Sequence, residues 1–279
     1  MRTVTTRSEL ARALESLPGS RALVMTMGAL HEGHLTLVRR ARDLADHVLV
    51  SIYVNPLQFG PGEDFDAYPR DLAADLALLE PEGVDLVFAP TDEVVYPRTP
   101  LVRIDPGPVG SILEGATRPG HFAGVLQVVH KVLCLTRPDV ALFGRKDAQQ
   151  LALVTTMVED LDVPVRIVPV EIVRDDDGVA RSSRNAYLSE GERVRARALV
   201  GALTAGAAAA DRGPDAALAA ARAVLDGAEG VELDYLVLVD PSTFTDLPPG
   251  ASEGLLAVAA RVGTTRLIDN AIVRFGGTP

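Results

Sequence analysis

The sharpest chemical feature of the sequence is a pair of histidines, His31 and His34, that follows an apolar run at residues 21–26. A helix is expected to begin at about residue 33. Two imidazoles three residues apart at a helix start lie on one face, beside backbone N–H groups and the positive end of the helix dipole. This arrangement suits phosphate oxygens, above all where negative charge grows during phosphoryl chemistry. We therefore predict that both histidines act on a phosphate group.

Two other interpretations of this pair stay open. The histidines could be structural and hydrogen-bonded to carbonyls, or they could bind zinc. A zinc site would need a third ligand nearby, and the single cysteine, Cys134, falls in an apolar helix expected at 128–135. The sequence contains neither a Walker A motif nor G-x-G-x-x-G, so a bound nucleotide would have to rely on the histidines instead of a glycine loop.

A lysine offers a second phosphate contact. Lys146 lies just past the apolar run 139–143, between Gly144 and Asp147, where the compact ammonium could reach a phosphate. A solvated surface lysine is the alternative, and Asp147 could equally be a helix N-cap.

A third polar group comes later in the chain. Ser182, Ser183 and Arg184 combine two hydroxyls with a guanidinium, which is a good set for phosphates. An ordinary loop with a helix cap is the alternative and, on local sequence alone, the preferred one.

Alternating strand and helix patterns predict the scaffold that positions these groups. Apolar strands are expected at 21–26, 48–53, 84–89, around 141 and at 165–170. Helices are expected at 6–16, 33–45, 71–79, 124–136 and 147–161. This order favours a doubly wound, Rossmann-like parallel α/β sheet, whose ligands lie beyond the carboxyl ends of the strands.

The composition changes after about residue 173. Ser189 and Glu192 form a capping box for a long alanine-rich helix, which Gly213–Pro214 should end before another helix. Apolar runs at 233–239, 255–262 and 266–272 follow, with a hairpin expected at 263–264. We therefore predict two domains: residues 1–172, and a smaller C-terminal α+β domain at 173–279.

Charge and composition limit the partners. The chain has 38 acidic and 27 basic side chains, a formal net charge of −11, so nucleic acid and anionic membranes are poor partners. No apolar run reaches the ~18 to 20 residues that a membrane span needs. With one cysteine and no secretory signal pattern at the N-terminus, the cytoplasm is the expected location.

A set of motifs runs through nearly the whole chain in a fixed order. It comprises residues 26–35 (TMGALHEGHL), 54–59 (VNPLQF), 68–70 (YPR), 118–125 (RPGHFAGV), 143–147 (FGRKD), 149–150 (QQ) and 182–185 (SSRN). Together they resemble the pantothenate synthetase (pantoate:β-alanine ligase) family of the H-x-G-H nucleotidylyltransferase superfamily. The resemblance implies an ATP-dependent ligase: pantoate attacks the α-phosphate of ATP to give pantoyl adenylate, and β-alanine then displaces AMP to give pantothenate.

The same resemblance assigns roles to individual residues. Catalytic roles fall to His31, His34 and Lys146, which also bind ATP. The further residues implied for ATP are Met27, Gly144, Asp147, Ser182, Ser183 and Arg184. The residues implied for pantoate are Met27, Asn55, Gln58, Arg118, His121 and Gln150. Gln58 and Gln150 suit a hydroxy acid in their own right, because each amide offers a donor and an acceptor without charge; exposed glutamine and core methionine are the ordinary alternatives.

The resemblance also bears on metal, assembly and domain movement. Asp75 matches an acidic position associated with Mg²⁺, but Ala74 stands where relatives often carry another acid. We expect the ion to be held mainly by phosphates and water. A homodimer formed through the first domain is implied, with the second domain acting as a lid over the nucleotide.

Several residues depart from the family pattern: Gln127, Arg145, Ala148 and Arg181. The two arginines are expected to add positive charge next to phosphate-binding segments, which could admit a different small acid. A nucleotidylyltransferase that keeps the nucleotidyl group on its product is the main alternative function. A tRNA synthetase and a catalytically silent nucleotide sensor are the others.

Overall fold

The computed structural model describes residues 1–63 and 65–276, and it divides into two compact units. The first unit comprises Met1–Gly144 and Gln149–Val170. The second comprises Arg145–Ala148 and the chain from Glu171 onward. Residues Arg145–Ala148, which lie inside the first predicted domain (1–172), thus group with the second unit.

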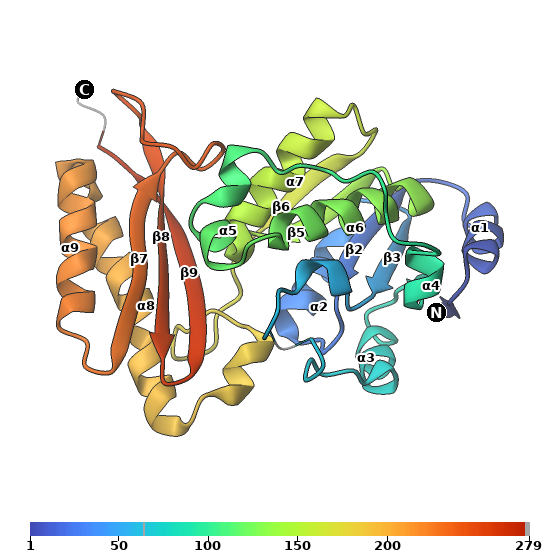
Figure 1. Cartoon of the computed structure of the whole chain (residues 1–279), viewed down its shortest axis with the longest axis horizontal. Helices are drawn as coiled ribbons and strands as arrows, with labels where there is room; N and C mark the ends of the chain where they lie inside the picture. The colour runs from blue at the N-terminus through green and yellow to red at the C-terminus, as the bar shows by residue number, and fades with distance from the viewer. Residues whose placement is uncertain (64, 277–279) are drawn as a thin grey trace. The chain divides into compact units, whose positions relative to one another are not determined.

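A six-stranded parallel sheet forms the centre of the first unit, which confirms the predicted doubly wound fold (Figure 1). Its strands are β1 (Arg2–Val4), β2 (Arg21–Thr26), β3 (His47–Ile52), β4 (Leu86–Phe88), β5 (Val140–Gly144) and β6 (Arg166–Val170), in the spatial order β1-β4-β3-β2-β5-β6. All five pairings are parallel. Strand β1 was not predicted, because its three residues are too few to show a period.

Helices connect these strands. They are α1 (Arg7–Glu15), α2 (Glu32–Arg42), α3 (Leu72–Leu79), α4 (Asp92–Val95), α5 (Glu114–Thr117), α6 (His121–Thr136) and α7 (Ala148–Asp160). The 3-10 turns η1 (Pro56–Gln58), η2 (Pro108–Ser111) and η3 (Arg145–Asp147) lie in the loops. The four-residue helices α4 and α5 were not predicted, because one turn carries no amphipathic pattern.

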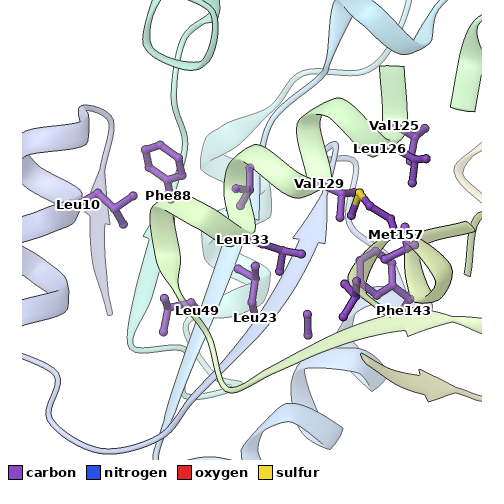
Figure 2. Close-up of a cluster of buried hydrophobic side chains, with 14 of the residues drawn as sticks. Leu10, Leu23, Leu49, Phe88, Val125, Leu126, Val129, Leu133, Phe143 and Met157 are labelled. Carbon is purple, nitrogen blue, oxygen red and sulfur yellow. The ribbon is translucent and has the colours of Figure 1, made fainter. Parts of the chain in front are cut away.

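Two apolar cores hold the helices against the sheet. Alternation along β2 sends Leu23 to one face and Ala22 and Val24 to the other. Leu23 packs with side chains of α1, α6 and α7, among them Leu10, Leu133 and Met157 (Figure 2). The opposite face packs against α2 and α3. Burial on both faces explains why the strands read as continuous apolar runs.

The strand order reverses between β2 and β5. Strands β2, β3 and β4 follow one another outward in one direction, and β5 returns to pair with the other side of β2. In doubly wound sheets, ligands bind beyond the carboxyl ends of the strands at such a reversal. The chain leaves β2 into the segment of His31 and His34, and it leaves β5 directly into Arg145–Ala148.

The second unit contains the antiparallel sheet β7 (Val231–Val239), β8 (Glu253–Val262) and β9 (Thr265–Arg274), in that order. Helices α8 (Glu190–Ala209) and α9 (Pro214–Asp226) share an apolar core with it, and η4 (Ser183–Tyr187) and η5 (Ala210–Arg212) flank α8 (Figure 1). Gly263, at φ +61°, turns the β8–β9 hairpin where it was predicted. Among the described residues, no helix combines the length and apolarity that crossing a membrane requires.

Candidate active site

The paired histidines cap the N-terminus of α2. The Nδ1 atom of His31, the N-cap residue, accepts a hydrogen bond from the backbone N–H of Gly33 at 3.1 Å. In return, the N–H of His31 donates to Nδ1 of His34 at 3.2 Å, and the ring centroids lie 4.1 Å apart. The predicted shared face is confirmed. The backbone amide of Gly33 is occupied by the His31 ring.

These caps define the tautomers of both rings. A backbone N–H can only donate, so Nδ1 of each imidazole must be an unprotonated acceptor. We therefore assign the neutral rings the tautomer that carries hydrogen on Nε2. Each ring then carries an N–H donor on the nitrogen opposite to its cap, as binding to a phosphate oxygen requires.

A buried carboxylate shapes the loop that leads into the pair. Asp75, on α3, is only 3% exposed and accepts hydrogen bonds from the amides of Ala29 (3.2 Å) and Leu30 (2.8 Å). Gly28 adopts φ +85°, and a Cβ there would lie 2.8 Å from an Asp75 oxygen, so glycine is needed for this close approach. Asp75 thereby fixes the backbone immediately before His31.

Three of the residues predicted to bind the hydroxy acid form one hydrogen-bonded chain. Asn55 donates from Nδ2 to Oε1 of Gln58 (3.2 Å) and to the carbonyl of Gly124 (3.0 Å). The amide Nε2 of Gln58 in turn contacts Sδ of Met27 at 2.8 Å. Since Asn55 can only donate through Nδ2, this contact sets which way the Gln58 amide points.

Tyr96 and Gly124 support Asn55. The Tyr96 hydroxyl donates to Oδ1 of Asn55 at 3.0 Å, and burial, followed by the charge of Asp92, raises the pKa of Tyr96, so the phenol keeps its proton. At Gly124 a Cβ would come within 2.0 Å of the Leu57 carbonyl oxygen, so only glycine lets α6 approach η1 this closely. Sequence reasoning missed Tyr96 because its partner lies 41 residues away.

Arg118 and His121 contact the same turn at the backbone carbonyl of Gln58. His121 Nε2 accepts from the Arg118 guanidinium (3.0 Å), so its Nδ1–H donates to the backbone carbonyl of Gln58 (2.8 Å). Arg118 also forms a forked ion pair with Glu63, at 2.9 and 2.6 Å. Burial raises the pKa of Glu63, but hydrogen bonding and the charge of Arg118 outweigh it and lower the pKa overall. Glu63, which sequence reasoning missed, therefore stays ionised and balances Arg118.

The glutamines after β5 differ from each other. Gln149 is buried and fully engaged: it accepts from the Glu114 amide and donates to the carbonyls of Val109 and Ile112. Gln150 is half-buried, and within the described part of the chain its amide has no hydrogen-bond partner. Only Gln149 is thus committed to structural hydrogen bonds, and the role of Gln150 as a ligand contact stays a prediction.

Apart from Gly144, which ends β5 in the first unit, the remaining predicted site residues belong to the second unit. Lys146, in η3, is about one-fifth exposed, and its Nζ lies 3.8 Å from an oxygen of the exposed Asp147. Ser182 caps η4, because its Oγ accepts from the Arg184 amide at 3.3 Å. That cap is the structural alternative foreseen for this segment, and it leaves the hydroxyl hydrogen of Ser182 to donate elsewhere.

The two arginines that depart from the family pattern are both paired. Arg181 Nε lies 2.5 Å from Asp175, and Arg145 Nε lies 2.8 Å from Glu171. A carboxylate thus lies beside each added charge, and the expected effect of the two arginines on substrate choice stays a prediction. Gln127 also has a local role, since its side chain accepts from the Ile104 amide. Nothing in the structure explains Ala148.

The donor set does not favour a metal cage. In the stretches 1–63 and 65–276, no group of three His, Cys, Asp or Glu residues is placed to hold a metal ion. Asp75 as a magnesium contact stays a prediction, and its oxygens already serve backbone amides.

Comparison with known proteins covers nearly the full chain. The model of the pantoate-beta-alanine ligase family matches residues 2–272. A pantothenate synthetase of Salinispora arenicola is 58% identical over 277 residues, 97% of each chain. A pantothenate synthetase structure from Thermus thermophilus superposes with a TM-score of 0.92 at 47% identity, over 97% of this chain and 99% of that one. A ligase from Francisella tularensis, solved with an ATP compound and β-alanine, gives 0.81 at 31% identity over 98% and 97%.

Proposed function

Since this chain belongs to the pantoate-beta-alanine ligase family, we propose that it joins pantoate to β-alanine at the expense of ATP. A carboxylate oxygen of pantoate attacks the α-phosphorus, and pyrophosphate leaves with the electron pair of the broken P–O bond. The amine of β-alanine then attacks the acyl carbon, loses a proton, and expels AMP. Adenylation is needed because a free carboxylate is a poor acylating agent.

The observation that carries this proposal is the capped histidine pair directly after β2. Both rings carry hydrogen on Nε2, so His31 and His34 can donate to the phosphates without bringing formal charge. In the proposal, His34 and Lys146 stabilise the negative charge that grows on the phosphates in the transition state. The rigid caps keep the imidazoles oriented before substrate arrives, so little reorganisation is needed during reaction.

The pantoate residues divide by the contacts they make. We assign direct contacts to Gln58 and Gln150, whose uncharged amides can bind both a hydroxyl and a carboxylate. Met27 lines the same pocket in this proposal. Asn55 is 1% exposed and donates a hydrogen bond to the Gln58 side chain, so we assign it the role of holding Gln58 in place. Arg118 and His121, through the Gln58 carbonyl, are given the same supporting role.

The remaining assignments concern the nucleotide and the cell. Residues proposed for ATP besides the catalytic three are Met27, Gly144, Asp147, Ser182, Ser183 and Arg184. We expect Mg²⁺ to arrive with the triphosphate, held mainly by phosphate oxygens and water. Neither adenylation nor aminolysis, as proposed, requires a protein ligand for the ion. We also propose that the second unit acts as a lid, that the protein forms a homodimer, and that it lies in the cytoplasm. Light scattering after size exclusion would test the dimer, and a monomeric mass would reject it.

The proposed reaction is tested by identifying products while each substrate is omitted in turn. With ATP, Mg²⁺, pantoate and β-alanine, mass spectrometry should find pantothenate, AMP and pyrophosphate in equal amounts. Without β-alanine, pyrophosphate release should stop after about one turnover and no AMP should appear, because AMP leaves only when the amine attacks the acyl carbon. A lasting nucleotide conjugate would indicate a nucleotidylyltransferase instead. Activity with another acid but not with pantoate would show that pantoate is not the substrate.

Changing Gln58 or Gln150 to alanine should impair the use of pantoate far more than the binding of ATP. Of the substrates, only the acid is proposed to bind these two amides, so we expect kcat/KM for pantoate to fall by about 10 to 100-fold, as when one to two good hydrogen bonds are lost. Steady-state kinetics with each substrate varied would measure this.

Gln149→Ala is the matched control for these two variants. It removes a neighbouring, fully engaged amide and should lower the melting temperature without a selective effect on pantoate. Equal losses for ATP and pantoate in the Gln58 and Gln150 variants would reject the assignment.

Arg181→Met should leave the fold intact and change ATP use less than about threefold. The pair with Asp175 is partly exposed, and such pairs contribute little to stability. Asp175 also keeps a second partner, Arg193, at 2.7 Å. Complete loss of adenylation in this variant would mean that the arginine acts in catalysis.

A further inference from the structure

Asn270 makes an unusual pair of contacts far from its place in the sequence. Its side-chain Nδ2 donates to the backbone carbonyls of Arg145 and Lys146, each at 2.9 Å. Asn270 lies on β9, 124 residues from Lys146, and is only 6% exposed. Its two amide hydrogens therefore hold two successive peptide groups, one of which belongs to the lysine proposed to act in catalysis.

The position of Asn270 on β9 suits this task. Neighbours along a strand alternate between faces, so Asn270 faces away from Leu267 and Val273, which both belong to the core shared with α8 and α9. A buried asparagine outside that core needs polar partners, because an unpaired buried amide is costly. The two carbonyls of the lysine segment supply them.

The residue next to Asn270 anchors the strand at this point. Asp269 is 4% exposed and receives a two-bond ion pair from Arg174, at 2.6 and 3.0 Å. One of its oxygens also accepts from the Asn270 backbone amide at 2.8 Å. The backbone that presents the Asn270 side chain is thus fixed by a buried charge pair, which limits how far the amide can move.

The two hydrogen bonds from Asn270 connect the segment Arg145–Ala148 to the second unit, although the residues on either side of it in sequence belong to the first. Strand β5 and all but the first residue of α7 belong to the first unit, yet Arg145–Ala148 groups with the second. The turn η3 that carries Lys146 is only three residues long, Arg145–Asp147. The hydrogen bonds from the Asn270 side chain hold the backbone of that turn in place.

We propose that Asn270 is a positioning residue for Lys146: by holding the Arg145 and Lys146 carbonyls, it fixes the direction in which the lysine side chain leaves the backbone. This inference rests on the proposed function in one respect, namely that Lys146 acts during adenylation. Asn270 itself touches no reacting atom. Its effect on rate passes entirely through the lysine.

Asn270→Asp is the sharpest variant, because it keeps the shape of the side chain and removes both donor hydrogens. Misplacement of a reacting group by about 1 Å can cost about 100-fold in rate, so we expect kcat for adenylation to fall by about 10 to 100-fold. The rate with preformed pantoyl adenylate and β-alanine should change little. Wild-type adenylation in Asn270→Asp would overturn the proposal.

A double-mutant cycle with Lys146→Ala separates positioning from general damage. If Asn270 acts through the lysine, Asn270→Asp should cost nothing further once the lysine side chain is gone. Multiplying losses in the double variant would contradict the inference. Leu267→Ala, on the other face of the same strand, is the matched control: it should lower the melting temperature while leaving kcat for adenylation within about twofold below the unfolding transition.

Hydrogen exchange tests, without an activity measurement, whether Asn270 orders the backbone of Arg145–Ala148. In Asn270→Asp, backbone amides of Arg145–Ala148 should exchange faster than in the wild type, whereas Leu267→Ala should affect β8 and β9 instead. Unchanged exchange at Arg145–Ala148 would reject the contact itself. If the wild type forms no adenylate, the proposed function fails, and the exchange result still decides whether Asn270 orders the lysine segment.

Discussion

Replacing His34 or Lys146 by alanine should slow adenylate formation by about 10² to 10³, the range found when one transition-state donor is removed. Both groups are proposed to address the same phosphate charge, so their losses should not multiply fully in the double variant. With preformed pantoyl adenylate and β-alanine, His34→Ala should still make pantothenate, because the acyl carbon is already activated. Rapid-quench measurement of each half-reaction would check both statements.

The cap made by His34 calls for a second variant. His34→Ala also removes the acceptor for the His31 amide, which should cost about 1 kcal/mol of stability, as for a lost helix cap. Glutamine at this third helical position can accept the same amide hydrogen, as in ordinary capping boxes. His34→Gln should therefore restore the melting temperature but not the rate. Restoration of both would mean that His34 is only a helix cap.

Asp75→Asn should lower kcat for adenylation by about 10²-fold. An asparagine side chain can accept only one of the two amide hydrogens, and its own NH₂ would face the other donor. The Gly28–Leu30 backbone would shift, and His31 and His34 with it, and an error of about 1 Å in position carries a cost of this size. Single-turnover adenylation at saturating substrates would measure the loss.

Magnesium dependence separates this positioning role from metal binding. If Asp75 mainly orders the loop, the half-saturating Mg²⁺ concentration should stay near the wild-type value while the maximal rate falls. If Asp75 mainly binds the ion, Asp75→Asn should raise the Mg²⁺ requirement, and excess Mg²⁺ should restore the rate. Full restoration would contradict the loop-ordering role.

The predictability of the fold depends on how many residues define each element. Long periodic segments such as α2 and α6, and the buried strands β2 and β3, were predicted to within a few residues because burial repeats along them. The three residues of β1 and the single turns α4 and α5 repeat nothing. Their conformation comes from neighbours such as β4, which pairs with β1 along its whole length.

In the candidate site, too, only features with a local sequence pattern could be predicted. The His31–His34 pair was predictable because its geometry follows from a spacing of three on a helix. The contacts of Asp75 with the loop, of Glu63 with Arg118, and of Asn270 with Lys146 join residues 45, 55 and 124 positions apart. No local pattern encodes them, because each arises only once the strands and helices have packed.

The fate of the carboxylate oxygens of pantoate reports most directly on whether the chain works through an acyl adenylate. With both oxygens labelled as ¹⁸O, attack on the α-phosphorus carries one of them into the phosphate group. Aminolysis then breaks the bond between that oxygen and the acyl carbon. We predict that mass spectrometry will find one ¹⁸O in AMP and one in the new amide carbonyl. Labelled inorganic phosphate together with ADP, or AMP without ¹⁸O, would contradict the adenylate route.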